Sequence, residues 1–125
     1  MSSQSEYEIH CAIVAYLDVA LPANSVLHHS PNEGKHHIGY RIKQRRLGMR
    51  PGWPDIEVII PKKYWDYEKP WGPVFFEIKN EKGRLSKNQK EVIDEIEKAG
   101  GHCRVARSID NVSDYLHEFL GQSYA

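Results

Sequence analysis

The residues that most suggest catalysis lie at the end of a short apolar run, where two charged side chains occur. In residues 74–79 (VFFEIK), the alternation of side chains along a strand would place Glu77 and Lys79 side by side on one face. Charged groups at the end of an apolar strand are costly unless they are paired or used. Taken alone, the two residues are also explained by an ordinary ion pair at a solvated strand end.

A second acid, Asp55, opens the preceding apolar run, directly after Gly52-Trp53-Pro54. If the two runs pair antiparallel, the start of the first lies beside the end of the second, so Asp55 approaches Glu77. Two converging carboxylates repel unless a cation lies between them, and oxygen ligands with open positions suit Mg²⁺ or Mn²⁺. Lys79 would then position or deprotonate a water, or neutralise the charge of a phosphate.

Two helical segments are expected to supply further polar side chains. Gln89 shares a stripe with the apolar residues of its segment, which predicts that it faces the sheet near Glu77. Capping of the Ser86 backbone is the alternative role for Gln89, and both roles are compatible. In the first helix Glu6 aligns with the apolar stripe and Glu8 with its flank, so Glu6 is the preferred inward acid. For either acid, a favourable interaction with the helix dipole is the alternative.

These residues must be positioned by a mixed sheet with helices on its faces. Apolar periodicity predicts helices over residues 6–20, 86–99 and 108–120, and strands over 25–29, 55–60, 74–79 and 102–106. Residues 30–54 are broken up by Pro and Gly, with at most a short helical turn over 40–47. Ser5 and Ser86 are predicted N-caps. The strand–helix–strand passage over 74–106 predicts a parallel pair, and the fold class is α/β in a single domain, residues 1–125.

The composition and the distribution of charge indicate which class of partner the protein could bind. The 125 residues are 40% hydrophobic and 27% charged, with no net charge, yet six basic residues and no acid lie between Lys35 and Pro54. Such a segment can present a positive surface to nucleic acid, and a solvated basic loop is the alternative. Cys11 and Cys103 lie alone in their segments, which favours reduced thiols. With no signal-like start and no apolar run long enough to span a membrane, we expect a cytoplasmic protein.

The order of these motifs resembles the PD-(D/E)XK nuclease superfamily and, within it, the VRR-NUC nuclease domain. The resemblance is carried by Gly52-Trp53-Pro54-Asp55, Phe76-Glu77-Ile78-Lys79, Gly83-Arg84-Leu85-Ser86 with Gln89, Glu6-Tyr7-Glu8-Ile9 and His29-Ser30-Pro31-Asn32. It extends over about residues 5–120. The sequence departs from the family pattern at His10, where Gln is usual, and at Glu33-Gly34, where two glycines are usual. The resemblance implies a restriction-endonuclease-like core with the element order α-β-β-β-α-β-α.

The resemblance also implies a metal-dependent phosphodiesterase acting on DNA. By motif match, Mg²⁺ or Mn²⁺ would be held by Asp55, Glu77 and the backbone carbonyl of Ile78, while Lys79 would serve the attacking water, Gln89 would support it and Glu6 would complete the site. Stand-alone members, often viral, resemble dimeric enzymes that cleave branched DNA such as Holliday junctions. A homodimer is therefore expected, in the host cytoplasm if the protein is viral. The expected nucleic-acid contacts are His29, Asn32, Lys35, Arg41, Lys43, Arg45 and Arg46.

Three alternatives to a metal-dependent DNA nuclease are a zinc-binding protein, a non-catalytic DNA-binding module and a nuclease acting on RNA. The histidine pairs at 28–29 and 36–37 suggest zinc, but no Cys or i,i+4 His pair completes a tetrahedral set. A non-catalytic DNA-binding module of the same fold is a second alternative, although the presence of Asp55, Glu77, Lys79 and Gln89 argues against inactivity. A nuclease acting on RNA is also compatible with the sequence.

Overall fold

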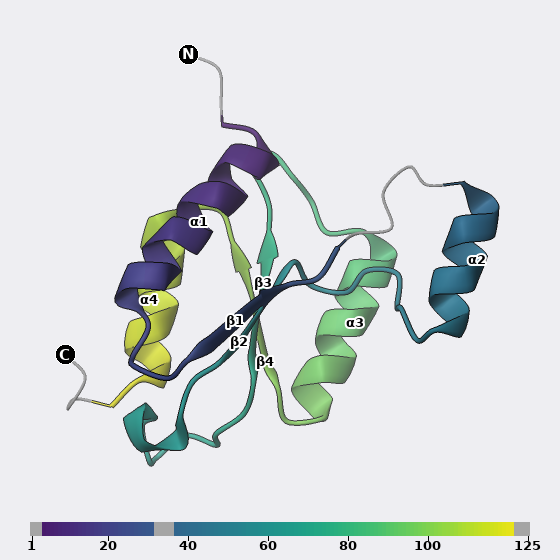
Figure 1. Ribbon diagram of the computed structural model, residues 1–125. Helices are drawn as coiled ribbons and strands as arrows, with labels where there is room; N and C mark the ends of the chain where they lie inside the picture. The colour runs from purple at the N-terminus through teal and green to yellow at the C-terminus, as the bar shows by residue number, and fades with distance from the viewer. Residues whose placement is uncertain (1–3, 32–36, 122–125) are drawn as a thin grey trace.

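The computed structural model describes residues 4–31 and 37–121, which form a four-stranded sheet covered by helices (Figure 1). The elements follow in the order α1 (Glu6–Ala20), β1 (Val26–His29), α2 (Ile38–Arg46), β2 (Ile56–Ile59), the 3-10 helix η1 (Lys62–Tyr64), β3 (Val74–Ile78), α3 (Lys87–Lys98), β4 (His102–Ala106) and α4 (Ile109–Phe119). The predicted α/β class is confirmed. The expected order holds, with the helix α2 between β1 and β2 and the 3-10 helix η1 between β2 and β3 in addition.

The strand order in the sheet is β1-β2-β3-β4. β1 pairs antiparallel with β2 and β2 antiparallel with β3, whereas β3 and β4 are parallel, as the crossover through α3 predicts. Ile56 of β2 lies opposite Phe76 of β3. In an antiparallel pair with this register, the residue before Ile56 lies level with the residue after Phe76, which places Asp55 beside Glu77.

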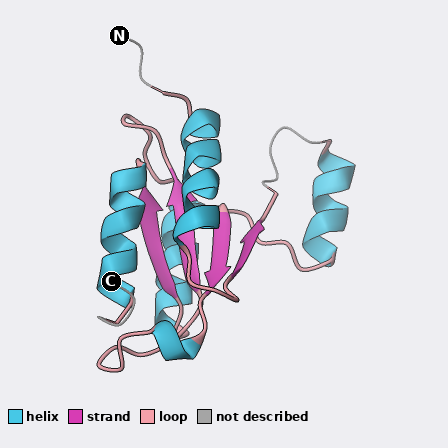
Figure 2. Cartoon of the chain, turned by 60° about the vertical axis from the view of Figure 1, so that its left-hand side comes forward, coloured by secondary structure: helices cyan, strands magenta, loops and turns pink. Residues whose placement is uncertain are grey.

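Each face of the sheet packs against different helices (Figure 2). On one face Phe76 and its neighbours pack against Leu17 of α1 and Phe119 of α4, all fully buried. On the other face Phe75 packs against Val92 of α3 in a smaller cluster. Because side chains alternate along β3, Glu77 shares the α3 face with Phe75, and its environment is set by the first turn of α3.

The two predicted serine caps are confirmed, and both belong to capping boxes. The side chain of Ser5 accepts a hydrogen bond from the Glu8 backbone at the start of α1, and that of Ser86 accepts one from the Gln89 backbone at the start of α3. The helix α3 ends where Gly100 adopts φ +100°, a conformation that glycine tolerates at a helix terminus. All of the predicted helices and strands other than the 40–47 turn end within one residue of the observed positions.

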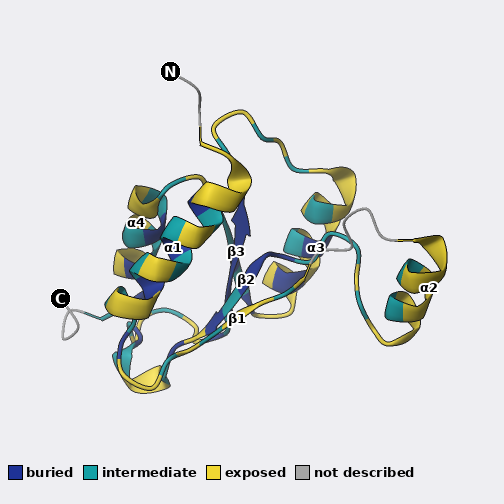
Figure 3. Cartoon of the chain, turned by 45° about the horizontal axis from the view of Figure 1, so that its top comes forward, coloured by how far each residue is buried: buried dark blue, intermediate teal, exposed yellow. Residues whose placement is uncertain are grey.

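The helical turn expected over residues 40–47 is observed as a helix, α2, that begins two residues earlier and ends one residue earlier than expected. It is nine residues long and begins where Nδ1 of His37 accepts a hydrogen bond from the Gly39 backbone at 3.0 Å. Histidine is not among the usual N-cap residues, which is why the segment carries no recognisable start signal. Every residue of α2 is exposed or half-buried, and the helix lies apart from the sheet (Figure 3). None of the helices in the described ranges is long and apolar enough to cross a membrane.

Candidate active site

Three charged side chains, Asp55, Glu77 and Lys79, are buried together where β2 begins and β3 ends. Their exposed fractions are 6%, 2% and 9%, and no other charged residue in the described part of the chain is buried. The carboxylate of Asp55 is fixed by the neighbouring strand, because its Oδ2 accepts a hydrogen bond from the Ile78 backbone N–H at 2.8 Å. The structure therefore brings the three residues of the sequence motif to one corner of the sheet.

The carboxylate of Glu77 has one satisfied oxygen and one unsatisfied oxygen. Its Oε1 accepts a hydrogen bond from Nε2 of Gln89 at 3.2 Å, whereas its Oε2 is buried with no hydrogen-bond partner among the described residues. Burial is the main cause that raises the pKa of Glu77 from 4.5 to about 9. The negative charge of Asp55, and the hydrogen bond that a protonated Glu77 would share with the Asp55 carboxylate, raise this pKa further, and Lys79 opposes them. A second charge at this position needs a proton or a cation to be stable.

Lys79 is held between the end of β3 and the first turn of α1. Its Nζ lies 3.9 Å from Oε1 of Glu6, and its side chain is 11% exposed against 50% for that of Glu6. The other candidate acid, Glu8, accepts a hydrogen bond from the Ser5 hydroxyl at 3.1 Å as part of the α1 capping box. Glu6, although half-exposed, is thus the acid of α1 that lies beside Lys79.

The turn after β3 is clamped by a residue that none of the sequence motifs includes. Nη1 of Arg107 donates to the carbonyl oxygens of Asn80 at 2.6 Å and Gly83 at 2.8 Å. At Gly83, a Cβ atom would lie 3.2 Å from Cδ of Lys79 and 3.3 Å from Oε1 of Glu6. The absence of a side chain at Gly83 therefore lets the turn rest directly on the Lys79–Glu6 pair.

Two histidines border the site on the side of β1. Nδ1 of His29 donates to the backbone carbonyl oxygen of Asp55, 2.9 Å away, and the rings of His10 and His29 meet edge to face with centroids 4.7 Å apart. Burial and the neighbouring His29 lower the pKa of His10. His29, expected at a nucleic-acid contact, is thus placed against the backbone of the acidic site. His10 was not expected there, since the sequence marked it only as a departure from the family pattern.

The oxygen donors at this corner suit a hard divalent cation. No group of three or more His, Cys, Asp or Glu residues that could hold a metal ion occurs among residues 4–31 and 37–121. Mg²⁺ needs no such group, because it keeps several waters and is commonly bound by one or two carboxylates. The buried, unsatisfied Oε2 of Glu77 and the adjacent carboxylate of Asp55 fit that requirement.

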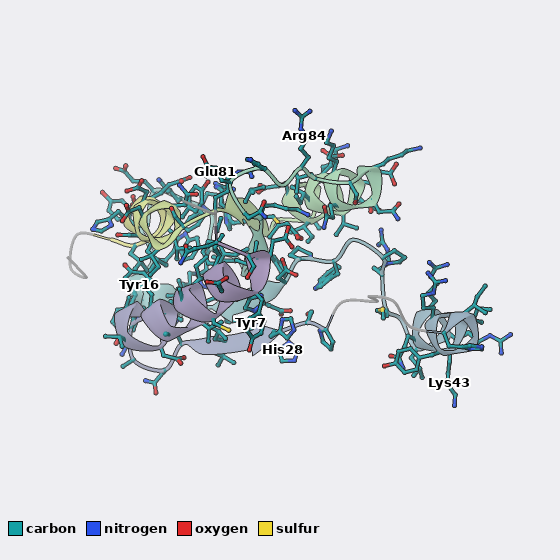
Figure 4. All side chains as sticks on the ribbon, turned by 90° about the horizontal axis from the view of Figure 1, so that it is seen from above. Tyr7, Tyr16, His28, Lys43, Glu81 and Arg84 are labelled. Atoms are coloured by element: carbon teal, nitrogen blue, oxygen red, sulfur yellow. The ribbon has the colours of Figure 1, made fainter. Side chains whose placement is uncertain are left out.

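The basic residues expected to contact nucleic acid are separate from the acidic corner. Arg41, Lys43, Arg45 and Arg46 all lie on α2, and Lys43 extends outward from that helix (Figure 4). Asn32 and Lys35 lie outside the described residues. The fold thus presents a basic helix apart from the sheet and a buried acidic site at the sheet's corner.

Comparison with known proteins agrees with this arrangement. Residues 3–110 match the family model described as "VRR-NUC domain". A solved structure described as a "VRR_NUC domain protein" is similar to this chain, with a TM-score of 0.73 at 22% identity over 94% of this chain and 89% of that chain. No curated protein matches. Because the family model covers most of the sequence and the fold agrees, the chain belongs to the VRR-NUC domain family of PD-(D/E)XK nucleases and has a nuclease-type fold.

Proposed function

We propose that this protein is a divalent-metal-dependent endonuclease that hydrolyses phosphodiester bonds in DNA. The observation that carries the proposal is the pair of buried carboxylates, in which Oε2 of Glu77 has no hydrogen-bond partner within the described chain. A purely structural Glu–Lys ion pair would not bury a second carboxylate, Asp55, next to it. The nuclease-type fold of the family supports the same conclusion.

The residues that would hold Mg²⁺ or Mn²⁺ are Asp55, Glu77 and the backbone carbonyl of Ile78. A divalent ion bound there lowers the pKa of a bound water and neutralises developing charge on a phosphate oxygen. Gln89 restrains Glu77 through Oε1, which leaves Oε2 for a ligand. The Ile78 N–H restrains Asp55 in the same way through Oδ2. The protein thus fixes both carboxylates before any ion binds.

Lys79 would act on the water and the phosphate. Its ammonium group is confined by burial and by Glu6 at 3.9 Å, so its position relative to the carboxylates is defined. A cation at this position orients the attacking water and stabilises negative charge that develops on the phosphate. In this proposal Glu6, Asp55, Glu77, Lys79 and Gln89 form the catalytic set.

The substrate we propose is branched DNA, such as a Holliday junction, bound by a homodimer. Two-fold pairing would present two basic 35–54 segments and two acidic sites to one junction, matching the symmetry of the junction itself. The exposed basic residues of α2 would supply phosphate contacts, which position DNA without reading its sequence.

One set of assays tests the proposal against its alternatives. Labelled duplex, flap, splayed-arm and four-way junction DNA, and RNA of the same sequence, are incubated with Mg²⁺, Mn²⁺ or EDTA. We expect cleavage of branched DNA with either metal ion and none in EDTA. Binding without cleavage in every metal would favour the non-catalytic module, and preferential cleavage of RNA would favour the ribonuclease. Sedimentation equilibrium measures the oligomeric state, for which we expect a dimer at micromolar concentration.

A further inference from the structure

A pocket of about 670 Å³ lies next to the acidic corner, between α2, the segment 48–53 and the first turn of α3. Gln89 lines this pocket and also donates to Glu77, so the pocket and the candidate active site share one side chain. The volume is within the range of about 300–1,000 Å³ that is typical of small-molecule sites. The pocket therefore adjoins the candidate active site through Gln89.

The wall formed by residues 48–53 is held firmly against α3. Gly52 has φ +84°, and a Cβ atom there would lie 2.7 Å from the carbonyl carbon of Asn88 and 2.8 Å from the backbone nitrogen of Gln89. Nη2 of Arg50 also binds Oε2 of Glu95 on α3 at 2.6 Å. The next residue after Gly52, Trp53, packs edge to face on Phe75, with ring centroids 5.5 Å apart. The pocket wall and its indole ring are therefore positioned by the same packing that positions Gln89.

The residues that line the pocket combine aromatic surface with neutral hydrogen-bonding groups. Trp53 and Tyr40 supply the aromatic rings, and Gln44 and Asn88 supply amide groups. Arg50 is the one charged residue among the described lining residues, and it is already paired with Glu95. Such a lining suits a flat, neutral ligand with polar edges better than a free phosphate or a purely apolar chain.

We propose that this pocket receives one unstacked nucleobase of the DNA strand whose phosphate lies beside Lys79 in the candidate active site. The inference rests on the proposed nuclease function and adds a substrate requirement, namely that a nucleotide adjacent to the cut be free to leave the stack. Bases at a branch point or in a single strand meet this requirement at low cost, whereas bases inside a continuous duplex do not. The pocket would thus contribute to preference for branched DNA independently of oligomeric state.

The test is a double-mutant cycle between the DNA and the pocket. A splayed-arm duplex is prepared with a single abasic spacer placed at each nucleotide near the branch point in turn, and its dissociation constant is measured in EDTA. Tyr40→Ala removes an aromatic ring from the pocket, and Asn88→Ala is a second variant on a different wall. Tyr67→Ala is the matched control, because Tyr67 is 92% exposed and is not among the residues that line the pocket.

For the wild type and Tyr67→Ala, we expect one spacer position to weaken binding by about 5- to 150-fold, the effect of removing one base–aromatic stack. In Tyr40→Ala or Asn88→Ala, the same spacer should weaken binding by a clearly smaller factor, because the side chain that contacts the base has already been removed. Equal costs in all four proteins, or no sensitive position, would overturn the pocket assignment. Cleavage of unmodified branched DNA in Mg²⁺ is measured in parallel. If the DNA is cleaved but the spacer has the same effect in wild type and in the pocket variants, the pocket assignment alone is rejected. If the spacer effect is smaller in the pocket variants but no DNA is cleaved, the nuclease activity is rejected and the pocket assignment is supported.

Discussion

Gln89 and Glu77 are joined by a hydrogen bond of 3.2 Å from Nε2 to Oε1, while Oε2 of Glu77 is buried and finds no hydrogen-bond partner in the described ranges. The Oε1 atom of Gln89 meanwhile accepts a hydrogen bond from the Ser86 backbone at 2.8 Å. The capping box that starts α3 therefore also holds the carboxylate at the end of β3. A helix start and a candidate metal ligand are fixed by the same amide group.

Replacing Glu77 by Gln should stabilise the metal-free protein at alkaline pH. The pKa of Glu77 is raised from 4.5 to about 9 on folding, so between these values the folded protein holds a proton that the unfolded chain releases. The free energy of unfolding should therefore fall as pH rises through this range. Glu77→Gln removes that dependence, and at pH 8 in EDTA we expect it to be more stable than wild type by at least about 1 kcal/mol.

Thermal melting between pH 5 and pH 9 in EDTA measures this difference. Glu91→Gln, which removes an exposed acid from α3, is the control for the removal of one charge. If the melting temperatures of wild type and Glu77→Gln follow pH in parallel, Glu77 does not carry the proton.

Gly83→Ala should slow cleavage while leaving the fold intact. The added Cβ atom would lie 3.1–3.3 Å from Asn80 Oδ1, Lys79 Cδ and Glu6 Oε1, so the Lys79–Glu6 pair must move. We expect a rate loss of about 10- to 100-fold, since small misplacements of a catalytic group are costly. The measurement is the initial cleavage rate together with the melting temperature. Gly121→Ala is the matched control, because its Cβ would meet only atoms at 3.6 Å or more. Equal rates for the two variants would contradict the role of Gly83.

Gly52→Ala should destabilise the protein more than Gly48→Ala. Both glycines have positive φ, +84° and +104°, so both substitutions carry backbone strain of about 1 kcal/mol. A Cβ at Gly48 meets nothing within 4 Å, whereas a Cβ at Gly52 meets the backbone of Asn88 and Gln89 at 2.7–2.8 Å. Urea denaturation should show an additional loss of about 1–3 kcal/mol for Gly52→Ala. Equal losses would mean that the segment 48–53 does not pack closely on α3.

Removing two basic side chains from α2 should weaken DNA binding and reduce its salt dependence. Lys43 and Arg46 lie in the last turn of α2. If both bind phosphates, the slope of log affinity against log salt should fall in magnitude by about 0.9 for each phosphate no longer neutralised. The variant with both Lys43→Ala and Arg46→Ala is compared with a variant with both Lys62→Ala and Lys63→Ala, which removes the same amount of charge from η1. An equal effect of both double variants would indicate a non-specific loss of positive charge.

Local sequence patterns were sufficient for most of the fold. The strand run 74–79, the Ser5 and Ser86 caps and the crossover to 102–106 each carry a short-range signal, and each is observed. The antiparallel pairing of β2 with β3 then follows, and with it the approach of Asp55 to Glu77. Asp55 and Glu77 lie about twenty residues apart in the sequence, and the register of β2 against β3 places them side by side.

Residues that act through tertiary packing left no such signal. Arg107 reaches the carbonyls of Asn80 and Gly83 from 24–27 residues away, and nothing in its own segment indicates that hydrogen bonding. His10 of α1 meets the ring of His29 of β1 through tertiary packing, which neither segment indicates by itself. The start of α2 was placed two residues too late because its N-cap is His37, which is not a usual start signal, and because none of its residues is buried.

The most direct test of the central claim is the initial rate at which the protein cleaves a four-way DNA junction, measured for wild type and Lys79→Ala with Mg²⁺ and with EDTA. Wild type should cleave with Mg²⁺ and not with EDTA. Lys79→Ala should still bind the junction but cleave about 10²- to 10⁴-fold more slowly, the usual contribution of a positioned acid–base group. Cleavage by wild type that continues unchanged in EDTA, or cleavage by Lys79→Ala at the wild-type rate, would contradict a metal-dependent site built on Asp55, Glu77 and Lys79.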